Sequence, residues 1–166
     1  MVDDEVEEPS ERAGELARAA ALRLLAVRAR THAELRAALG RKGYPPEVVD
    51  GVLGRLESVG LVDDRSFAQT WVEQRAGSQA RGRVALRAEL HRKGVDKGLI
   101  DAAVSSVDPE TEREAARSLC QRRARALAHL SPGVRARRLH GLLARRGYPE
   151  AVAREVVSDV LAQEEQ

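Results

Sequence analysis

The residues best suited to bind an anion are three short basic stretches, each ending in glycine. They are Arg41-Lys42-Gly43, Arg92-Lys93-Gly94 and Arg145-Arg146-Gly147. Guanidinium and ammonium groups bind phosphate or carboxylate oxygens. The same residues suit the end of a helix, because cations favour its partly negative terminus and glycine adopts the left-handed conformation that follows. Two interpretations stay open: plain helix ends, or helix ends that also line up as a basic stripe.

Further arginines gather in the middle of the chain. Arg81 and Arg83 flank Gly82 at a predicted junction between a loop and a helix, where we expect their side chains to project, and Arg87 follows one turn later. The candidate residues for binding a partner or DNA are Arg81, Arg83, Arg87, Arg92, Lys93, Arg41, Lys42, Arg145 and Arg146. Secondary candidates are Arg122, Arg123, Arg125, Arg137 and Arg138. For each of them the alternative is a solvated helix face.

The sequence contains no enzyme signature. It has neither a GxxxxGK[ST] phosphate cradle nor a GxGxxG loop. Its four histidines are not paired at helical spacing, and Asp63-Asp64 suits a helix start better than a metal pair. Cys120 lies at helical spacing between alanines, so we expect a buried, inert thiol. We therefore predict no catalytic residue, no metal and no cofactor.

Charge is distributed unevenly along the chain of 166 residues. Six of the 26 acidic residues lie within residues 1–11, which hold no basic residue, so the formal net charge of +2 conceals a cationic remainder. We expect an acidic, disordered leader ahead of a cationic folded part. No apolar run approaches the length of a membrane span, and the acidic start does not resemble a secretion signal. These features favour a cytoplasmic protein without a membrane contact.

A repeat of about 50 residues organises the sequence. The glycines of the three basic stretches are 51 and 53 residues apart, and leucines lie eight and four residues before each of them. Apolar residues also follow each glycine at intervals of four, which predicts two amphipathic helices around a glycine stop. A further helix is predicted ahead of each pair, at residues 17–29, 64–78 and 109–130.

The sequence thus predicts an all-α fold, a tandem array of three three-helix repeats with about nine helices and an elongated form. The expected boundaries are an acidic leader at 1–14, repeats at 15–62, 63–108 and 109–162, and a tail at 163–166. Helix starts are predicted at a capping box from Thr31 to Glu34, at Asp63 or Asp64, at Asp96, at Asp108-Pro109 and at Ser131-Pro132. Residues 76–83 are the expected internal loop.

One alternative comes from the first repeat alone. Residues 21–64 have the order of helices of a winged-helix DNA-binding transcriptional regulator, with residues 46–57 entering the major groove. The exposed positions of that helix are mostly acidic, and residues 61–64 lead directly into a predicted helix where a two-stranded wing is required.

The central block resembles the RecX family, which regulates the RecA recombinase. The residues that carry the resemblance are GLVDDRSFAQTWVEQR at 60–75 and RGRVALRAELHRKGVDKGLID at 81–101. The first resembles the family's Gly-hydrophobic-Asp-Asp-x-x-Phe-Ala signature, and the second its G-x-x-x-(I/L)-x-x-x-L-x-x-K-G-(I/V) signature. The resemblance covers about residues 15–162, and the leader lies outside it.

The resemblance implies an extended array of three-helix repeats that binds in the helical groove of the RecA–DNA filament. It implies inhibition of ATP hydrolysis, strand exchange and coprotease activity, without catalytic residues or a cofactor. Contact with neighbouring RecA subunits is implied, direct contact with single- or double-stranded DNA is left open, and we expect a monomer. Charge reversal at Arg83 and Arg87 together is expected to weaken RecA inhibition without lowering helicity.

Overall fold

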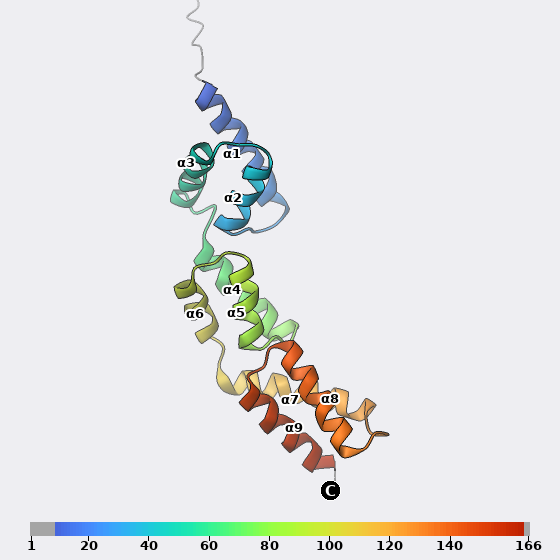
Figure 1. Cartoon of the computed structure of the whole chain (residues 1–166). Helices are drawn as coiled ribbons and strands as arrows, with labels where there is room; N and C mark the ends of the chain where they lie inside the picture. The colour runs from blue at the N-terminus through green and yellow to red at the C-terminus, as the bar shows by residue number, and fades with distance from the viewer. Residues whose placement is uncertain (1–8, 165–166) are drawn as a thin grey trace, which may run out of the picture. The chain divides into compact units, whose positions relative to one another are not determined.

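The computed structural model describes residues 9–164, and every regular element among them is an α-helix. The nine helices of this part are α1 (Pro9–Val27), α2 (His32–Arg41), α3 (Pro46–Ser58), α4 (Asp64–Ser78), α5 (Arg83–Arg92), α6 (Lys97–Ser105), α7 (Pro109–Ala126), α8 (Pro132–Arg146) and α9 (Glu150–Glu164). The predicted all-α class is confirmed. The helices follow one another along the chain without a strand between any described pair (Figure 1).

The chain divides into two compact units. Unit 1 consists of residues 9–67 together with Lys93–Asp96, and unit 2 consists of Ala68–Arg92 and residues 97–164. The boundary therefore does not fall between repeats. The glycine turn after α5 belongs to the unit of the first repeat, while α5 itself belongs to the other.

Unit 1 is built on α1, α2 and α3, which pack against one another. Alanines of α1 let the other two helices approach closely, and leucines and valines one helical turn apart fill the space between them. The buried residues of this core are Ala17, Ala20, Ala21, Leu35, Leu39, Val49, Val52, Leu53, Leu56 and Val62. The periodicity read from the sequence thus identifies the buried face.

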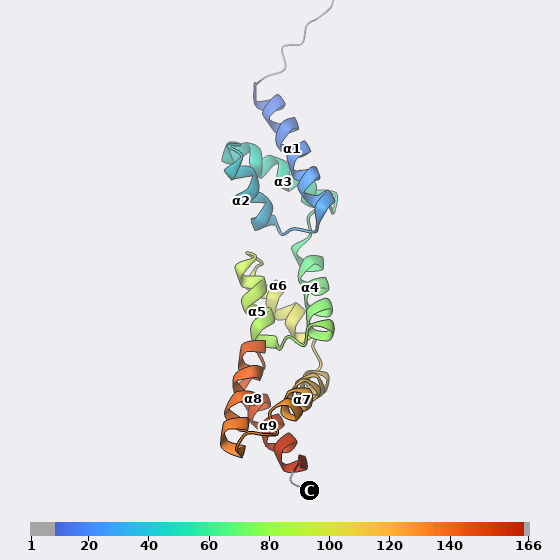
Figure 2. The same cartoon turned by 90° about the vertical axis from the view of Figure 1, so that its right-hand side faces the viewer.

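Unit 2 contains a second such bundle, made of α7, α8 and α9, and a pair formed by α5 and α6 (Figure 2). The bundle buries Cys120, Leu139, Leu143, Val156 and Val160, among others. Aliphatic residues on one side of α5 and α6 are also buried, at Leu86, Leu90, Ile100 and Val104. Burial of these apolar stripes stabilises the helices, which are too short to be stable alone.

Most of the predicted helix starts are confirmed. Thr31 and Glu34 form the capping box at the start of α2. The Asp108 carboxylate accepts the Thr111 backbone N–H at 2.8 Å. Asp63 rather than Asp64 caps α4, since it accepts the Ser66 N–H at 2.9 Å. The expectation for Ser131 is wrong in one respect: it occupies the N-cap position of α8, but its hydroxyl makes no capping hydrogen bond.

The glycine stops are confirmed as left-handed turns. Gly43, Gly94 and Gly147 have φ values of 88°, 76° and 79°. In this region a side chain is strained, so glycine is the residue that ends each helix at low cost.

Three expectations differ from the structure. Helix α4 ends at Ser78, as the predicted helix at 64–78 does, so the internal loop is shorter than the predicted 76–83. Helix α1 begins at Pro9, inside the segment predicted as leader at 1–14; residues 1–8 and 165–166 lie outside the described residues. The winged-helix alternative is wrong, because α4 starts at Asp64 where a wing would have to begin and the described chain has no strand.

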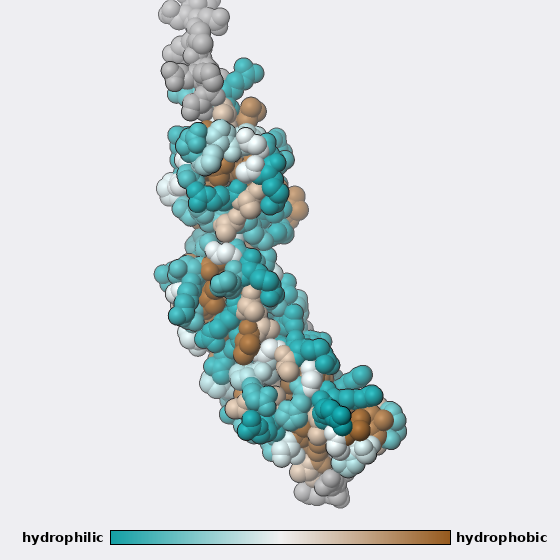
Figure 3. Space-filling view, in the orientation of Figure 1, coloured by the Kyte–Doolittle hydropathy of each residue, from teal (hydrophilic) through white to brown (hydrophobic). Residues whose placement is uncertain are grey.

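The visible surface of both units is mostly hydrophilic, and apolar residues appear on it as small separate patches (Figure 3). Within the described residues no helix combines the length and the hydropathy that crossing a membrane requires.

Candidate nucleic-acid interface

A groove of about 670 Å³ lies between α7 and α8 in unit 2. Six of its ten lining residues are arginines and none is acidic. We call this site the arginine groove, after Arg122, Arg123, Arg137, Arg138, Arg145 and Arg146; the other lining residues are Leu119, Ala126, Gly141 and Leu142.

Helical spacing explains why these residues meet. On α7 the lining positions are 119, 122, 123 and 126, and on α8 they are 137, 138, 141, 142, 145 and 146. Residues three and four apart share one face of a helix, so each helix presents a stripe toward the groove. The two helices pack against each other, which places the stripes on facing sides.

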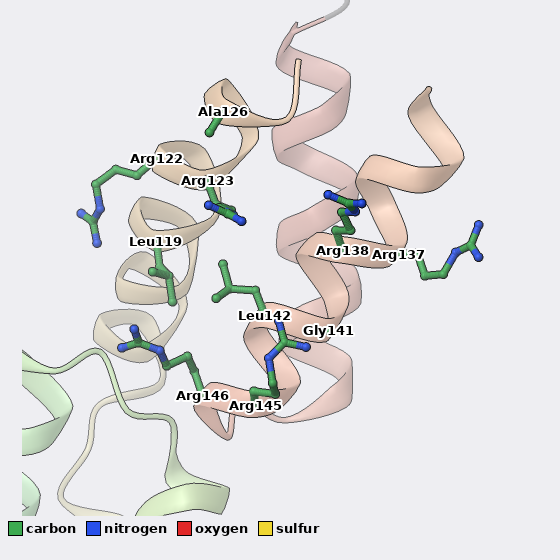
Figure 4. Close-up of a pocket in the computed structure, with 10 residues that line it drawn as sticks. All are labelled: Leu119, Arg122, Arg123, Ala126, Arg137, Arg138, Gly141, Leu142, Arg145 and Arg146. Atoms are coloured by element: carbon green, nitrogen blue, oxygen red, sulfur yellow. The ribbon is translucent and has the colours of Figure 1, made fainter. Parts of the chain in front are cut away.

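The groove has an apolar floor and a cationic rim (Figure 4). Leu119 and Leu142 lie between the two helices, and the Arg123 side chain extends into the space between them. Arg122 and Arg137 point outward on opposite sides. Gly141 widens the groove, because a side chain there would contact the Arg145 guanidinium.

The six guanidinium groups are not neutralised. Within residues 9–164 none of them forms an ion pair with a carboxylate, and all except Arg146 are exposed. Arg122 donates to the Ser118 hydroxyl and Arg146 donates to the Gln79 carbonyl, each at 2.7 Å. Gathering like charges without counter-charges raises the local potential, and an anion bound there relieves the repulsion.

The start of α7 provides the contrast. Arg113 pairs with Glu110 and with Glu155, the latter at 3.0 Å. Arg117 pairs with Glu114 at 3.0 Å and approaches Asp159 at 3.5 Å. The arginines of the first turns of α7 are therefore used within the fold, whereas those of its last turns are available for a ligand.

The two central arginines expected to project do not do so. The Arg83 guanidinium is 2.7 Å from Glu112, whose other carboxylate oxygen accepts the Arg83 backbone N–H at 2.8 Å. The Glu112 side chain is only 1% exposed, and the Arg83 guanidinium is the cation that compensates this buried carboxylate. Arg81 is 2.9 Å from the buried Glu89. The expectation of free side chains is wrong for both residues, and their contact with a partner stays a prediction.

Glu89 is the centre of a small polar cluster in unit 2. It accepts a hydrogen bond from the Trp71 indole N–H at 3.0 Å, and the Arg75 guanidinium lies 3.7 Å from the centre of the Trp71 ring. Trp71 is half-buried, so this side chain connects α4 to α5 rather than filling an apolar core.

Arg87 and Arg92 lie on the surface. Arg87 pairs with Asp101 at 3.3 Å, and both side chains are about half exposed. Arg92 is exposed and forms no ion pair with a described residue. Their binding role also stays a prediction.

The glycine turn at Lys93-Gly94 forms a joint with the start of α2 inside unit 1. The Lys93 carbonyl accepts the Thr31 hydroxyl at 2.6 Å, and the Lys93 ammonium is 2.8 Å from Glu34. Gly94 lies against Ala33 with no room for a Cβ. Burial alone would raise the pKa of Glu34, but hydrogen bonds from Arg28, Lys93 and Thr31 outweigh it and lower the pKa to about 2. We call this contact the first joint.

The turn at Arg146-Gly147 forms a similar joint with the start of α5 inside unit 2. The Arg146 carbonyl accepts the Gly82 N–H at 2.9 Å, and the Gly147 carbonyl accepts the Val84 N–H at 3.0 Å. A Cβ on Gly82 would overlap the Gly147 carbonyl. We call this contact the second joint.

Both joints bring the end of one helix turn to the beginning of another helix. Carbonyl groups at a helix C-terminus lack partners within the helix, and so do N–H groups at an N-terminus. The contacts in the joints satisfy some of these groups and bring opposite partial charges together. Lys93 and Arg146 therefore have a structural role in these joints, and whether their stretches also bind a partner stays a prediction.

The first stretch is different. Arg41 and Lys42 are exposed and form no ion pair with a described residue, and a Cβ on Gly43 would meet nothing within 4 Å. This turn, Arg41-Lys42-Gly43, is the free corner of the chain. Whether it binds a partner stays a prediction.

Every arginine of the groove is a candidate binding residue in the sequence, but the sequence does not predict that the six side chains come together. Arg145 and Arg146 were among the main candidates, and the other groove arginines were secondary candidates on two different helices. The signal available was the run of arginines at helical spacing with no acid among them, but the pairing of the two helix faces was not readable.

The single cysteine of the chain is buried. Cys120 is fully buried, and desolvation raises the pKa of its thiol to about 11, as expected for an inert residue. No group of histidine, cysteine and carboxylate side chains suited to a metal ion occurs within residues 9–164.

Comparison with known proteins gives one consistent family. Three family models match in succession: the first three-helix domain of RecX at residues 17–56, the second at 63–104 and the third at 110–157. Together they cover all three helices of each repeat, apart from the ends of some helices.

Relatives and solved structures agree with this. The chain is 47% identical to "Regulatory protein RecX" of Mycolicibacterium vanbaalenii over 96% of this chain and 90% of that protein. It is 46% identical to the Streptomyces coelicolor protein of the same name, over 95% and 84%. The crystal structure of RecX from Lactobacillus salivarius has the same fold, with a TM-score of 0.83 at 17% identity over 90% of this chain and 97% of that one.

Proposed function

Because the chain belongs to the RecX family of regulatory proteins, which act on the RecA recombinase, we propose that it binds in the groove of the RecA–DNA filament. There it inhibits RecA ATP hydrolysis, strand exchange and coprotease activity. It thereby regulates homologous recombination and the SOS response. The chain acts by binding, without a catalytic centre or a cofactor.

The observation that supports this proposal is the arginine groove. Six guanidinium groups without ion-pair partners in the described chain surround a concave surface, and no carboxylate lines it. A filament on DNA offers a continuous row of phosphates, each of which accepts two hydrogen bonds from one guanidinium. We assign the groove to the phosphate backbone of the DNA in the filament.

The apolar floor adds to this fit. Leu119 and Leu142 displace water from the bottom of the groove, and charge interactions above an apolar surface are screened less than in open solvent. The outward-pointing Arg122 and Arg137 extend the cationic surface on both sides of the groove, as binding along a polymer requires.

Inhibition follows if the protein prefers one state of the filament. A ligand shifts an equilibrium only by the difference between its affinities for the two states. A rigid three-helix repeat held on the DNA favours the filament arrangement that fits it, and RecA subunits held in that arrangement cannot complete the ATPase cycle.

The test is a titration of RecA ATPase activity on single-stranded DNA with the full chain. We expect inhibition that weakens as the salt concentration rises, because phosphate contacts release counterions. Inhibition without salt dependence would show that the groove does not bind the DNA phosphates. Absence of inhibition at saturating protein would refute the proposed function. Gel shifts on random single and double strands without RecA measure the DNA contact separately.

A further inference from the structure

The free corner of the first repeat has the same basic residue and glycine turn as the two joints, in which the turn already binds the start of a helix. Lys42 stands immediately before Gly43, as Lys93 stands before Gly94 and Arg146 before Gly147. All three glycines have a positive φ between 76° and 88°. The corners therefore present the same backbone turn, with a basic side chain beside it.

In the occupied joints the turn binds the first residues of a helix. The carbonyl before the glycine accepts a donor from the residue that precedes the helix, namely the Thr31 hydroxyl in the first joint and the Gly82 N–H in the second. The glycine lies against an alanine of the first helical turn, Ala33 or Ala85. In the first joint the lysine also pairs with a carboxylate of that turn, Glu34.

The free corner lacks all of these partners. Within residues 9–164 no donor reaches the carbonyl oxygens of Lys42 and Gly43, and no carboxylate pairs with Lys42. Both residues are exposed. The corner thus offers carbonyl acceptors, a cation and a glycine that a small residue can approach closely. These are the groups with which the first joint binds the start of a helix.

We propose that the free corner docks on the first turn of a helix of the RecA filament, one that carries a hydroxyl or N–H donor before it, a small residue within it and a carboxylate near its third position. This inference rests on the proposed function, since it takes RecA as the partner. The Lys42 and Gly43 carbonyls accept the donors of the helix start, Gly43 lies against the small residue, and Lys42 pairs with the carboxylate.

A second copy of this chain would have to meet the corner through a helix start other than those of α2, α5 and α8. The starts of α2 and α5 are already occupied by the two joints. The start of α8 has no acid in its first turn, so it offers no carboxylate to Lys42. A phosphate fits less well, because it has no donor for the corner carbonyls and lies against the partly negative end of α2.

The experiment replaces Lys42 in the full chain with the photocrosslinker p-benzoylphenylalanine. The matched control carries the same probe in place of Arg23, an exposed residue of α1 that forms no ion pair with a described residue. Both variants are bound to RecA filaments on single-stranded DNA, irradiated and analysed by mass spectrometry, after circular dichroism confirms the fold. We expect the probe at position 42 to label RecA in the first turn of a helix with the stated residues, at least about tenfold more strongly than the probe at position 23.

Labelling of another part of RecA, of DNA or of a second copy of the chain overturns the inference, and so does equal labelling from both positions. Co-sedimentation of the unmodified chain with the filament is measured alongside. Failure to sediment refutes the proposed function and the inference together, whereas normal sedimentation with the wrong crosslink refutes the inference alone. As a second variant, Lys42→Glu is expected to weaken co-sedimentation about tenfold, and Arg23→Glu to leave it unchanged.

Discussion

At Gly82, in the second joint, there is no room for even one added atom, the Cβ of an alanine. The Gly82 backbone lies so close to Gly147 and Tyr148 that a Cβ would overlap main-chain atoms, which cannot move aside as a flexible side chain does. This steric constraint explains why a glycine stands at this position of the central signature.

We expect Gly82→Ala to lower the free energy of unfolding by about 2 kcal/mol, because the added methyl group forces the second joint apart. Urea denaturation followed by circular dichroism measures the change. Gly51→Ala is the matched control, since Gly51 lies exposed inside α3 with nothing near its Cβ position. It is expected to stabilise the protein by about 0.5 kcal/mol, and equal effects of the two substitutions would contradict the steric argument.

Arg83 and Arg87 look alike in the sequence but have different environments. Arg83 neutralises the buried Glu112, whereas the pair between Arg87 and Asp101 is about half exposed. Breaking a buried pair leaves an unpaired charge out of water, while an exposed pair is compensated by solvent.

Arg83→Glu is accordingly expected to cost about 3 kcal/mol of stability, and Arg87→Glu less than about 1 kcal/mol. Thermal unfolding of the two variants compares them directly. Loss of RecA inhibition in the double variant would then reflect unfolding as well as a lost contact, so the expectation of unchanged helicity holds for Arg87 alone. A variant at Arg83 as stable as the one at Arg87 would contradict the structure.

At the scale of elements, the sequence predicted helices better than loops. The positions of α2, α3, α7 and α8 followed from apolar spacing of four and from capping residues, which act locally. The predicted helix at 64–78 matches α4, but the predicted loop at 76–83 overlapped it, because residues 76–78 are weak helix formers without a clear stop. There the structure adds contacts near the end of the helix, including the hydrogen bond from Arg75 to Gln79 at 3.0 Å.

The two joints could not be predicted in the same way. A basic pair before a glycine is fully explained by a helix end, so nothing local says that the turn also binds another helix. The partner residues lie far away in sequence, as with Thr31 and Lys93. The arginine groove could not be predicted either. The arginine stripes on α7 and α8 are visible in the sequence, but whether they face each other depends on how α7 packs on α8.

The first joint gives unit 1 a specific dependence on pH. The pKa of Glu34 is about 2 in the folded protein, below its ordinary value of 4.5, so its ionised form is stabilised by folding. This contribution is complete above about pH 4.5 and is lost as the pH falls toward about 2.

We therefore expect Glu34→Gln to reduce stability at neutral pH but to make it less sensitive to acid. Urea denaturation of both proteins at about pH 7 and about pH 3 tests this, since the difference between them shrinks as Glu34 becomes protonated. A constant difference at both pH values would show that the Glu34 charge does not stabilise the joint.

At the scale of the whole molecule, one three-helix plan serves several purposes. In the third repeat, the face between α7 and α8 gathers unpaired arginines, while the turn at the end of α8 holds the start of α5. In the first repeat the corresponding turn is free. The repeats thus share an architecture and differ in which surface is left for a partner.

The membership of the RecX family could be inferred from the central signature, and the three family matches confirm it. The surface that meets the filament could not be chosen from the sequence, because nearly all of the candidate arginines also suit a solvated face or a helix end. The ion pairs support our proposal of the groove: the buried carboxylates Glu89 and Glu112 engage Arg81 and Arg83, and no acid of the described chain lines the groove.

The most direct test of this account is RecA ATPase inhibition by the variant Arg123→Glu/Arg138→Glu, which reverses two charges in the groove. Its control is Arg125→Glu/Arg154→Glu, which changes the net charge equally at two exposed positions of the third repeat outside the groove. We predict that the half-inhibitory concentration of the groove variant rises about tenfold or more, with a salt dependence reduced by about 1.4 in the log–log slope, while the control inhibits like the unmodified chain. Equal inhibition by both variants would contradict the assignment of the arginine groove to DNA.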